Sequence, residues 1–200
     1  MAQRLAEKGR FYYVEMVAPP GSVYVAAVSV AIARRVKRGE EPGTEPLAIE
    51  LHPSLRGTRL RDVVWAELYP LIGPRVVQIL CDVGATGWSV RPLSVPDELD
   101  VLRDYGALVV HGRGGHIGPC REYSSIVLDK PGSPLLDVKG WCLDPEEWDG
   151  SDLWLQPAGV SHLIVTRRVR DAFRRAKVTG VRLVDLCELV SLVSREKFKI

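Results

Sequence analysis

Four nitrogen and sulfur side chains lie close enough in sequence, between residues 111 and 142, to form a metal site. His111, His116, Cys120 and Cys142 are of the types that bind zinc. Four residues separate the two histidines and three separate His116 from Cys120, a spacing that matches no familiar zinc finger. Buried cysteines commonly serve as small apolar side chains. We therefore predict no metal site, and a small metal-dependent hydrolase using these residues stays an alternative.

A glycine-rich stretch, GRGGHIG at residues 112–118, follows a predicted strand, where a phosphate-binding loop would lie. It lacks the GxGxxG spacing, carries no Lys-Ser/Thr pair and runs into Pro119 instead of opening a helix. We predict a turn here and no bound cofactor.

The hydroxyl and carboxyl groups of the chain form no recognisable catalytic set. Ser124-Ser125 and Ser161-His162 lie outside any GxSxG pattern. The paired carboxylates Glu146-Glu147 lie in a polar stretch where nothing evident would raise a pKa for acid catalysis. We predict no catalytic residue and no enzymatic activity.

Residues 167–177 form a predicted helix with six basic residues and one acidic residue. Such a density is typical of nucleic-acid binding, which stays an alternative function for this helix. However, Val169, Ala172, Phe173 and Ala176 form an apolar stripe, so the arginines occupy the opposite, solvated face. A single-strand binder would also need free aromatic rings among its basic residues.

The segment from Asp137 to Asp152 combines acidic residues with two tryptophans. Aromatic side chains anchor protein interfaces, and charges steer association with an oppositely charged partner. The alternative is a solvated loop whose tryptophans fold back onto the core. The residues predicted to bind a partner are Trp141, Asp144, Glu146, Glu147, Trp148 and Asp149.

An internal repeat provides the elements that must position these residues. Residues 71–90 return without a gap as residues 164–183, with Thr86-Gly87 matching Thr179-Gly180. Pro74 and Thr166 suit the start of a helix in their respective copies. Both helices carry apolar residues at i, i+3 and i+4: Val76, Ile79 and Leu80, and Val169, Ala172 and Phe173.

The repeat predicts an α+β fold with two β-loop-α-β units, at residues 62–95 and 152–185. We expect a mostly antiparallel or mixed sheet with helices packed on its face. The further predicted strands are 11–17, 47–51, 62–69, 88–95, 105–111, 124–128 and 181–184. Residues 24–37 suit either a strand or a helix, and we favour the helix. Residues 38–46 and 143–152 are predicted loops.

Composition indicates an ordinary globular protein of 200 residues, with 46% hydrophobic and 26% charged residues. We place residues 1–60 in the same domain as residues 61–200. The net charge of +2 is too small to indicate nucleic acid or membrane as a partner. The chain has no Cys-x-x-Cys pair, signal sequence or membrane span, so we expect it in the cytoplasm with reduced thiols.

The segment SDLWLQPAGVSHLIVTRRVRDAFRRAKVTGVRL (151–183) resembles the C-terminal signature of immunity protein family eleven of bacterial polymorphic toxin systems. RDVVWAELYPLIGPRVVQIL (61–80), DYGALVVHGRGG (104–115) and REYSSIVLD (121–129) resemble earlier parts of that family, with a weaker match at FYYVEMV (11–17). The resemblance implies a non-catalytic cytoplasmic protein that binds and neutralises a cognate toxin. A basic nuclease domain is the toxin that an acidic surface would suit.

Overall fold

The computed structural model describes residues 10–17, 22, 25–27, 45–51, 59–66, 69–115, 117–120, 124–129, 134–143, 147–156 and 163–194. Over these residues the fold is mixed α+β with strands in the majority, which confirms the predicted class. Antiparallel pairs predominate, and parallel pairs occur between β2 and β4, β3 and β6, and β8 and β13.

Six strands of the first half close into a barrel in the order β2-β3-β6-β7-β5-β4. They are β2 (Val25–Ala27), β3 (Leu47–Leu51), β4 (Val63–Ala66), β5 (Tyr69–Ile72), β6 (Trp88–Ser94) and β7 (Gly106–Val110). The barrel interior is apolar and includes Leu47, Ile49 and Leu71. The 3-10 helix η1 (Asp97–Leu102) adds buried Leu99 and Leu102 to it, so this half has a core of its own.

A five-stranded sheet forms the second half of the molecule, in the order β15-β1-β14-β13-β8. Its strands are β1 (Phe11–Met16), β8 (Gly112–Arg113), β13 (Leu153–Leu155), β14 (Leu163–Thr166) and β15 (Val181–Asp185). The N-terminal strand β1 lies between β14 and β15 and is antiparallel to both. Segments from the two ends of the chain therefore share one sheet.

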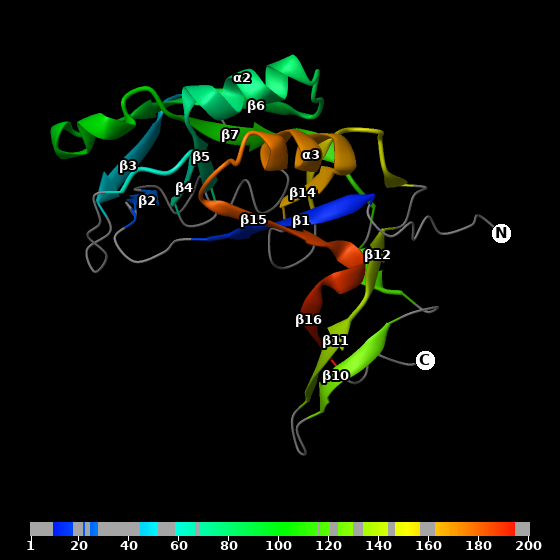
Figure 1. The fold of residues 1–200 in the computed structure, drawn as a ribbon. Coiled ribbons are helices and arrows are strands. Elements are labelled where there is room, and N and C mark those ends of the chain that lie inside the picture. The colour runs from blue at the N-terminus through cyan, green and yellow to red at the C-terminus, as the bar shows by residue number, and fades with distance from the viewer. Residues whose placement is uncertain are drawn as a thin grey trace.

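A small three-stranded sheet extends from this body as an arm (Figure 1). It contains β10 (Ser125–Asp129), β11 (Leu135–Lys139) and β16 (Val190–Ser194). The two-stranded ribbon of β9 (Ile117–Pro119) and β12 (Trp141–Leu143), together with the 3-10 helix η3 (Leu186–Glu188), joins the arm to the body. Leu136 and Val138 are buried in the arm, whereas every residue of β10 is exposed.

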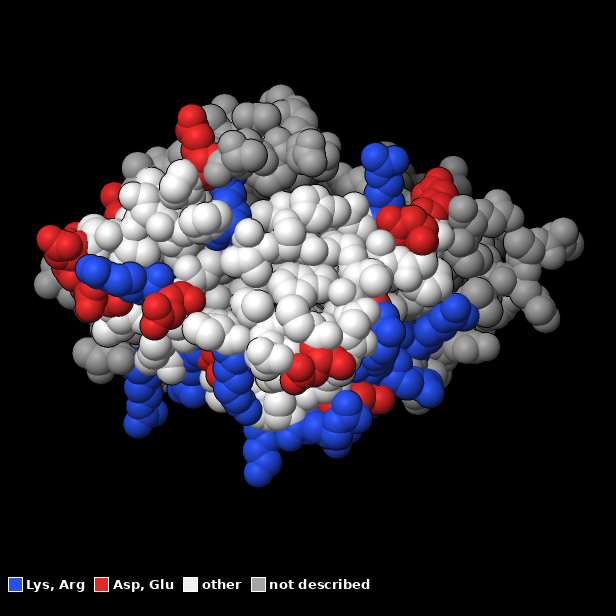
Figure 2. Space-filling model, turned by 90° about the horizontal axis from the view of Figure 1, so that it is seen from above, with Lys and Arg blue, Asp and Glu red and all other residues white. Residues whose placement is uncertain are grey.

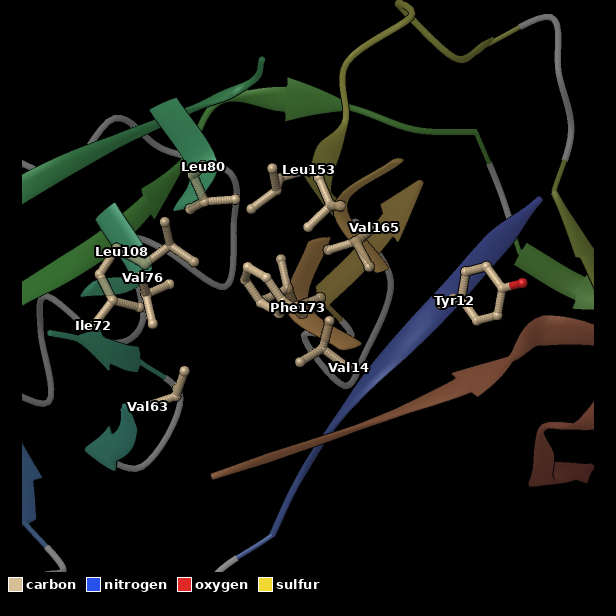
Figure 3. Packing of buried hydrophobic residues seen from close by; sticks show 12 residues of the cluster. Tyr12, Val14, Val63, Ile72, Val76, Leu80, Leu108, Leu153, Val165 and Phe173 are labelled. Atoms are coloured by element: carbon tan, nitrogen blue, oxygen red, sulfur yellow. The ribbon is translucent and has the colours of Figure 1, made fainter. Parts of the chain in front are cut away.

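The helices α2 (Pro74–Asp82) and α3 (Arg167–Arg175) lie side by side on the same side of the sheets (Figure 1). Their predicted apolar stripes are confirmed, because Val76, Leu80, Val169 and Phe173 are buried in one cluster with residues of both halves. Figure 3 shows Val76 and Phe173 pointing into this shared interior. Each such side chain contributes roughly 1.5 to 3 kcal/mol by leaving water.

The structure corrects several predicted strands and loops. Residues 62–69 are not one strand: β4 and β5 are separate antiparallel strands, with Val63 opposite Ile72. Residues 25–27, within the predicted helix 24–37, form a strand instead. The other residues of that predicted helix lie outside the described residues. The predicted turn 112–118 contributes to β8 and β9, because the backbone at both ends pairs with distant strands. In these cases long-range pairing outweighs local preference.

Local signals at the helix starts were partly right. Pro74 is the first residue of α2, as predicted. Thr166 is the N-cap residue of α3, but its side chain caps no N–H of the helix and instead donates to the carboxylate of Asp152. Asp152 itself, predicted to lie in an exposed acidic loop, is buried.

Two glycines allow a test of how closely the halves are packed. Gly180 has a φ of +91°, and a Cβ placed there would lie 2.0 Å from the carbonyl oxygen of Val63. Gly84 has a φ of +58°, but its Cβ would meet nothing within 4 Å. We expect Gly180→Ala to lower the free energy of unfolding by about 3 kcal/mol or more, and Gly84→Ala by about 1 kcal/mol. Urea unfolding of both variants measures this difference, and equal losses would contradict the close approach.

Candidate functional site

One half-buried carboxylate connects the start of the barrel half to the end of α3. Asp62 accepts hydrogen bonds from the N–H and the hydroxyl of Thr179, at 2.7 and 2.8 Å, and from Arg75 at 3.0 Å. The backbone follows the same path, since the N–H of Val63 donates to the carbonyl of Thr179. Arg75 also donates to the carbonyl oxygen of Ala176.

A second carboxylate, that of Asp152, connects the start of β13 to the segment that follows α2. Asp152 accepts hydrogen bonds from the N–H and the hydroxyl of Thr86, at 3.0 and 3.1 Å, and forms an ion pair with Arg168. The N–H of Leu153 donates to the carbonyl of Thr86. Arg168 also donates to the carbonyl oxygen of Gly84, at 3.1 Å.

Both carboxylates are held in their ionised form. Burial on its own raises the pKa of Asp62, but the hydrogen bonds from Thr179 and Arg75 outweigh it, and the pKa lies below its usual range. Burial also opposes ionisation of Asp152, and its bonds from Arg168, Thr166 and Thr86 lower the pKa in the same way. Carboxylates so fully surrounded by donors join segments of the fold, and they are poor general bases.

The acidic segment is anchored by Trp148. The ring of Trp148 lies 5.1 Å from Phe11 and 6.0 Å from Trp154, both of which are buried. Its indole N–H donates to the carbonyl of Ser151 at 2.9 Å, and the guanidinium of Arg10 lies over the ring at 5.4 Å. Trp148 therefore folds back onto the core, as the alternative interpretation of the sequence expected.

The carboxylate of Asp149 holds the turn that follows. It accepts hydrogen bonds from the backbone N–H of Arg113, at 2.8 Å, and of Ser151, at 2.9 Å. Partial burial opposes ionisation, but these bonds keep the pKa of Asp149 below its usual range. Glu147 is exposed beside it. The turn thus displays negative charge and is joined to the backbone of Arg113.

The other predicted partner-binding residues do not join this turn. Trp141 is half-buried on β12, where its indole donates to the carbonyl of Val138 at 3.0 Å and its ring packs toward the arm. Asp144 and Glu146 lie outside the described residues. The structure therefore brings together Glu147, Trp148 and Asp149 of the predicted set.

The structure describes three of the four side chains that the sequence offered for metal binding. Cys120 and Cys142 are buried thiols on the β9–β12 ribbon, and His111 Nε2 lies 2.6 Å from the hydroxyl of Ser89. His116, Ser161 and His162 lie outside the described residues. Within the described ranges, no three His, Cys, Asp or Glu side chains are grouped as a metal site would require. No helix in the same ranges is long and apolar enough to cross a membrane.

The basic residues of α3 do not form one uniform solvated face. Arg168 is paired with Asp152, and Arg170 lies over the ring of Tyr12, 4.4 Å from its centre. Figure 2 shows Lys and Arg side chains gathered along one border of the helical face, beside an uncharged centre. Beside α3 lies a groove of about 500 Å³. Sequence reasoning missed this groove because one of its walls, Tyr12, comes from the other end of the chain.

The lowered pKa of Asp152 leads to a pH-dependent prediction. Because its pKa is lower in the folded state, its stabilisation is present above the unfolded pKa of about 3.9 and is lost as pH falls through the folded value. We expect Asp152→Asn to lower the free energy of unfolding at pH 7 by about 3 kcal/mol. The difference from the parent should shrink below about pH 4.

Urea unfolding between pH 7 and pH 3 measures both effects. Asp104→Asn is the control, because Asp104 is an exposed aspartate outside the network. Parallel stability curves for the parent and Asp152→Asn down to pH 3 would contradict an ionised, stabilising Asp152.

No protein-family model and no curated protein matches the chain. The resemblance of residues 60–187 to immunity protein family eleven therefore stays a prediction.

Proposed function

We propose that this protein is a non-catalytic binding protein of the immunity class, which neutralises a cognate toxin in the cytoplasm. We further propose that it is built from two copies of one β-loop-α-β unit. The acidic turn at residues 147–149 is the proposed contact with the toxin, and the duplicated units are the scaffold that holds it.

Strand pairing supports the duplication. In the first unit β5, α2 and β6 are consecutive, and β5 and β6 flank the antiparallel strand β7, where both Leu71 and Arg91 pair with Ala107. In the second unit β14, α3 and β15 are consecutive and flank β1. There the corresponding residues Ile164 and Val184 both pair with Tyr13. The correspondence is the one that the sequence repeat predicts.

The hydrogen bonds between the units are also reciprocal. Asp62, before the first unit's strands, binds the Thr179-Gly180 junction of the second unit. Asp152, before the second unit's strands, binds the Thr86-Gly87 junction of the first. One difference remains: β7 follows β6 in the chain after the intervening helix η1, whereas its counterpart β1 is supplied by the N-terminal segment.

The observation that carries the proposed function is the preorganised acidic turn. Trp148 is locked into an aromatic cluster and Asp149 is bonded to two backbone N–H groups, so Glu147 is displayed from a fixed backbone. A surface that is already ordered loses less conformational entropy on binding. Such an acidic surface would compete with nucleic-acid phosphates for the basic cleft of a nuclease toxin.

Charge reversal at Glu147 tests this function. We expect Glu147→Lys to weaken binding to the inactivated cognate toxin domain by at least about tenfold, mainly through slower association. Calorimetry and stopped-flow fluorescence measure the affinity and the rate. Because Glu147 is exposed, its replacement should change the free energy of unfolding by only about 0.5 kcal/mol.

Glu98→Lys is the matched control, since Glu98 is an exposed acidic residue on η1, outside the acidic segment. It should preserve the affinity. An affinity that is the same for Glu147→Lys, Glu98→Lys and the parent would sink the proposed contact.

A further inference from the structure

The groove beside α3 combines an apolar wall with a cationic border. It lies where α3 meets β15 and β1, and encloses about 500 Å³. Its apolar wall consists of Phe173, Val178, Val181 and Leu183. Arg170, Arg174 and Lys177 line it from the helix side, and Asp185 is the acidic residue in its lining.

Arg170 and Arg174 lie on one face of α3, four residues apart, and Lys177 follows just after the C-terminal end of the helix. Arg170 is the most firmly held: its guanidinium lies over the ring of Tyr12 and donates to the Tyr12 hydroxyl. Its Nη1 forms an ion pair with Asp171 at 2.6 Å, while its buried Nε has no hydrogen-bond partner in the described part of the chain. Arg174 and Lys177 are exposed, so they can meet an incoming anion.

The first unit provides an internal comparison for these positions. By the correspondence proposed above, Arg170, Arg174 and Lys177 match Val77, Cys81 and Gly84. The scaffold therefore folds around neutral residues at all three places. The cations belong to the second unit alone and are not required by the shared β-loop-α-β architecture.

The apolar wall differs between the units in the same way. Val181 corresponds to Trp88, whose indole packs against the core and donates to the carbonyl of Ala85 at 2.9 Å. Ala85 is the counterpart of Val178, so the first unit has one large and one small side chain where the second has two valines. Valine at position 181 occupies less space beside the helix and leaves room for a ligand.

Lys177 also has an unfavourable backbone conformation. Its φ is +52°, in the left-handed region that disfavours a residue with a Cβ. Its counterpart in the first unit is a glycine, Gly84, with a φ of +58°. A strained residue that glycine would relieve is a common mark of a functional position. The Cβ of Lys177 is thus a cost to the fold that a glycine at this position would avoid.

We propose that this groove binds an extended peptide segment of a protein partner in which acidic side chains neighbour aliphatic ones. The apolar wall accepts the aliphatic side chains, and Arg174 and Lys177 pair with the carboxylates. Single-stranded nucleic acid fits less well, because Tyr12 and Phe173 are only 5% and 7% exposed and offer no open face for base stacking. The proposal uses the correspondence of the units but not the acidic turn or the toxin.

A selection from random peptides displayed on phage tests the groove without a known ligand. The full chain is the bait, and Val181→Trp, which installs the residue of the first unit, is the counter-bait that fills the groove. We expect enriched peptides that combine Asp or Glu with Leu, Ile or Val, and at least tenfold weaker binding of the synthesised peptide to Val181→Trp. No enrichment over the counter-bait, or a basic consensus, would overturn the proposal.

Variants of the cations separate binding from folding. We expect Lys177→Gly to weaken peptide binding at least fivefold in fluorescence anisotropy while the melting temperature stays equal or rises, because the backbone strain is relieved. Arg174→Ala should weaken binding similarly. Arg175→Ala, an exposed arginine of α3 outside the groove lining, is the control and should bind as the parent does.

An oligonucleotide provides the competing outcome. A labelled single-stranded oligothymidylate should bind more weakly than the selected peptide and should not displace it. Tighter binding of the oligonucleotide, lost in Arg174→Ala, would replace the peptide with nucleic acid as the ligand. Unchanged peptide affinity in Val181→Trp or in both cation variants would also contradict the proposed site.

Discussion

The mutual attachment of two aspartates to two Thr-Gly junctions is the constraint on which this structure depends. Asp62 binds the residues that follow α3, and Asp152 binds the residues that follow α2. Each helix is therefore fixed at its C-terminal end by the half of the molecule to which it does not belong. A partly buried carboxylate is costly without donors, and here the N–H, hydroxyl and guanidinium groups satisfy it. The network consequently selects one arrangement of the two halves.

Both proposed binding features follow from that arrangement. The acidic turn lies just before Asp152, so the bonds of Asp152 to Thr86 also fix where the chain leaves the turn. The groove lies beside α3, whose position over β1 and β15 depends on the packing of Phe173 in the shared interior. Both proposed surfaces thus adjoin segments held by hydrogen bonds or by core packing, which would limit the entropy lost on binding.

The two proposed units differ at positions that the shared architecture does not constrain. Their shared residues satisfy the demands of helix starts, apolar stripes and close backbone contact at Gly87 and Gly180, where a Cβ would collide with the carbonyls of Leu153 and Val63. The residues that differ, such as Arg174 against Cys81 and Val181 against Trp88, are free of those demands. Function can change at such positions without loss of the fold.

The sequence by itself determined the α+β class, the position of both helices, their buried faces and the Thr-Gly junctions. These depend on helical periodicity and short-range backbone preferences, which neighbouring residues express directly. Only the tertiary structure decided that β1 enters between β14 and β15, that Val63–Ala66 and Tyr69–Ile72 form two antiparallel strands, and that Asp152 is buried. It also decided that Tyr12 and Arg170 line one groove. In each of these features, segments distant in sequence must meet. One segment supplies only part of the hydrogen bonds or of the packed surface, and the other segment supplies the rest.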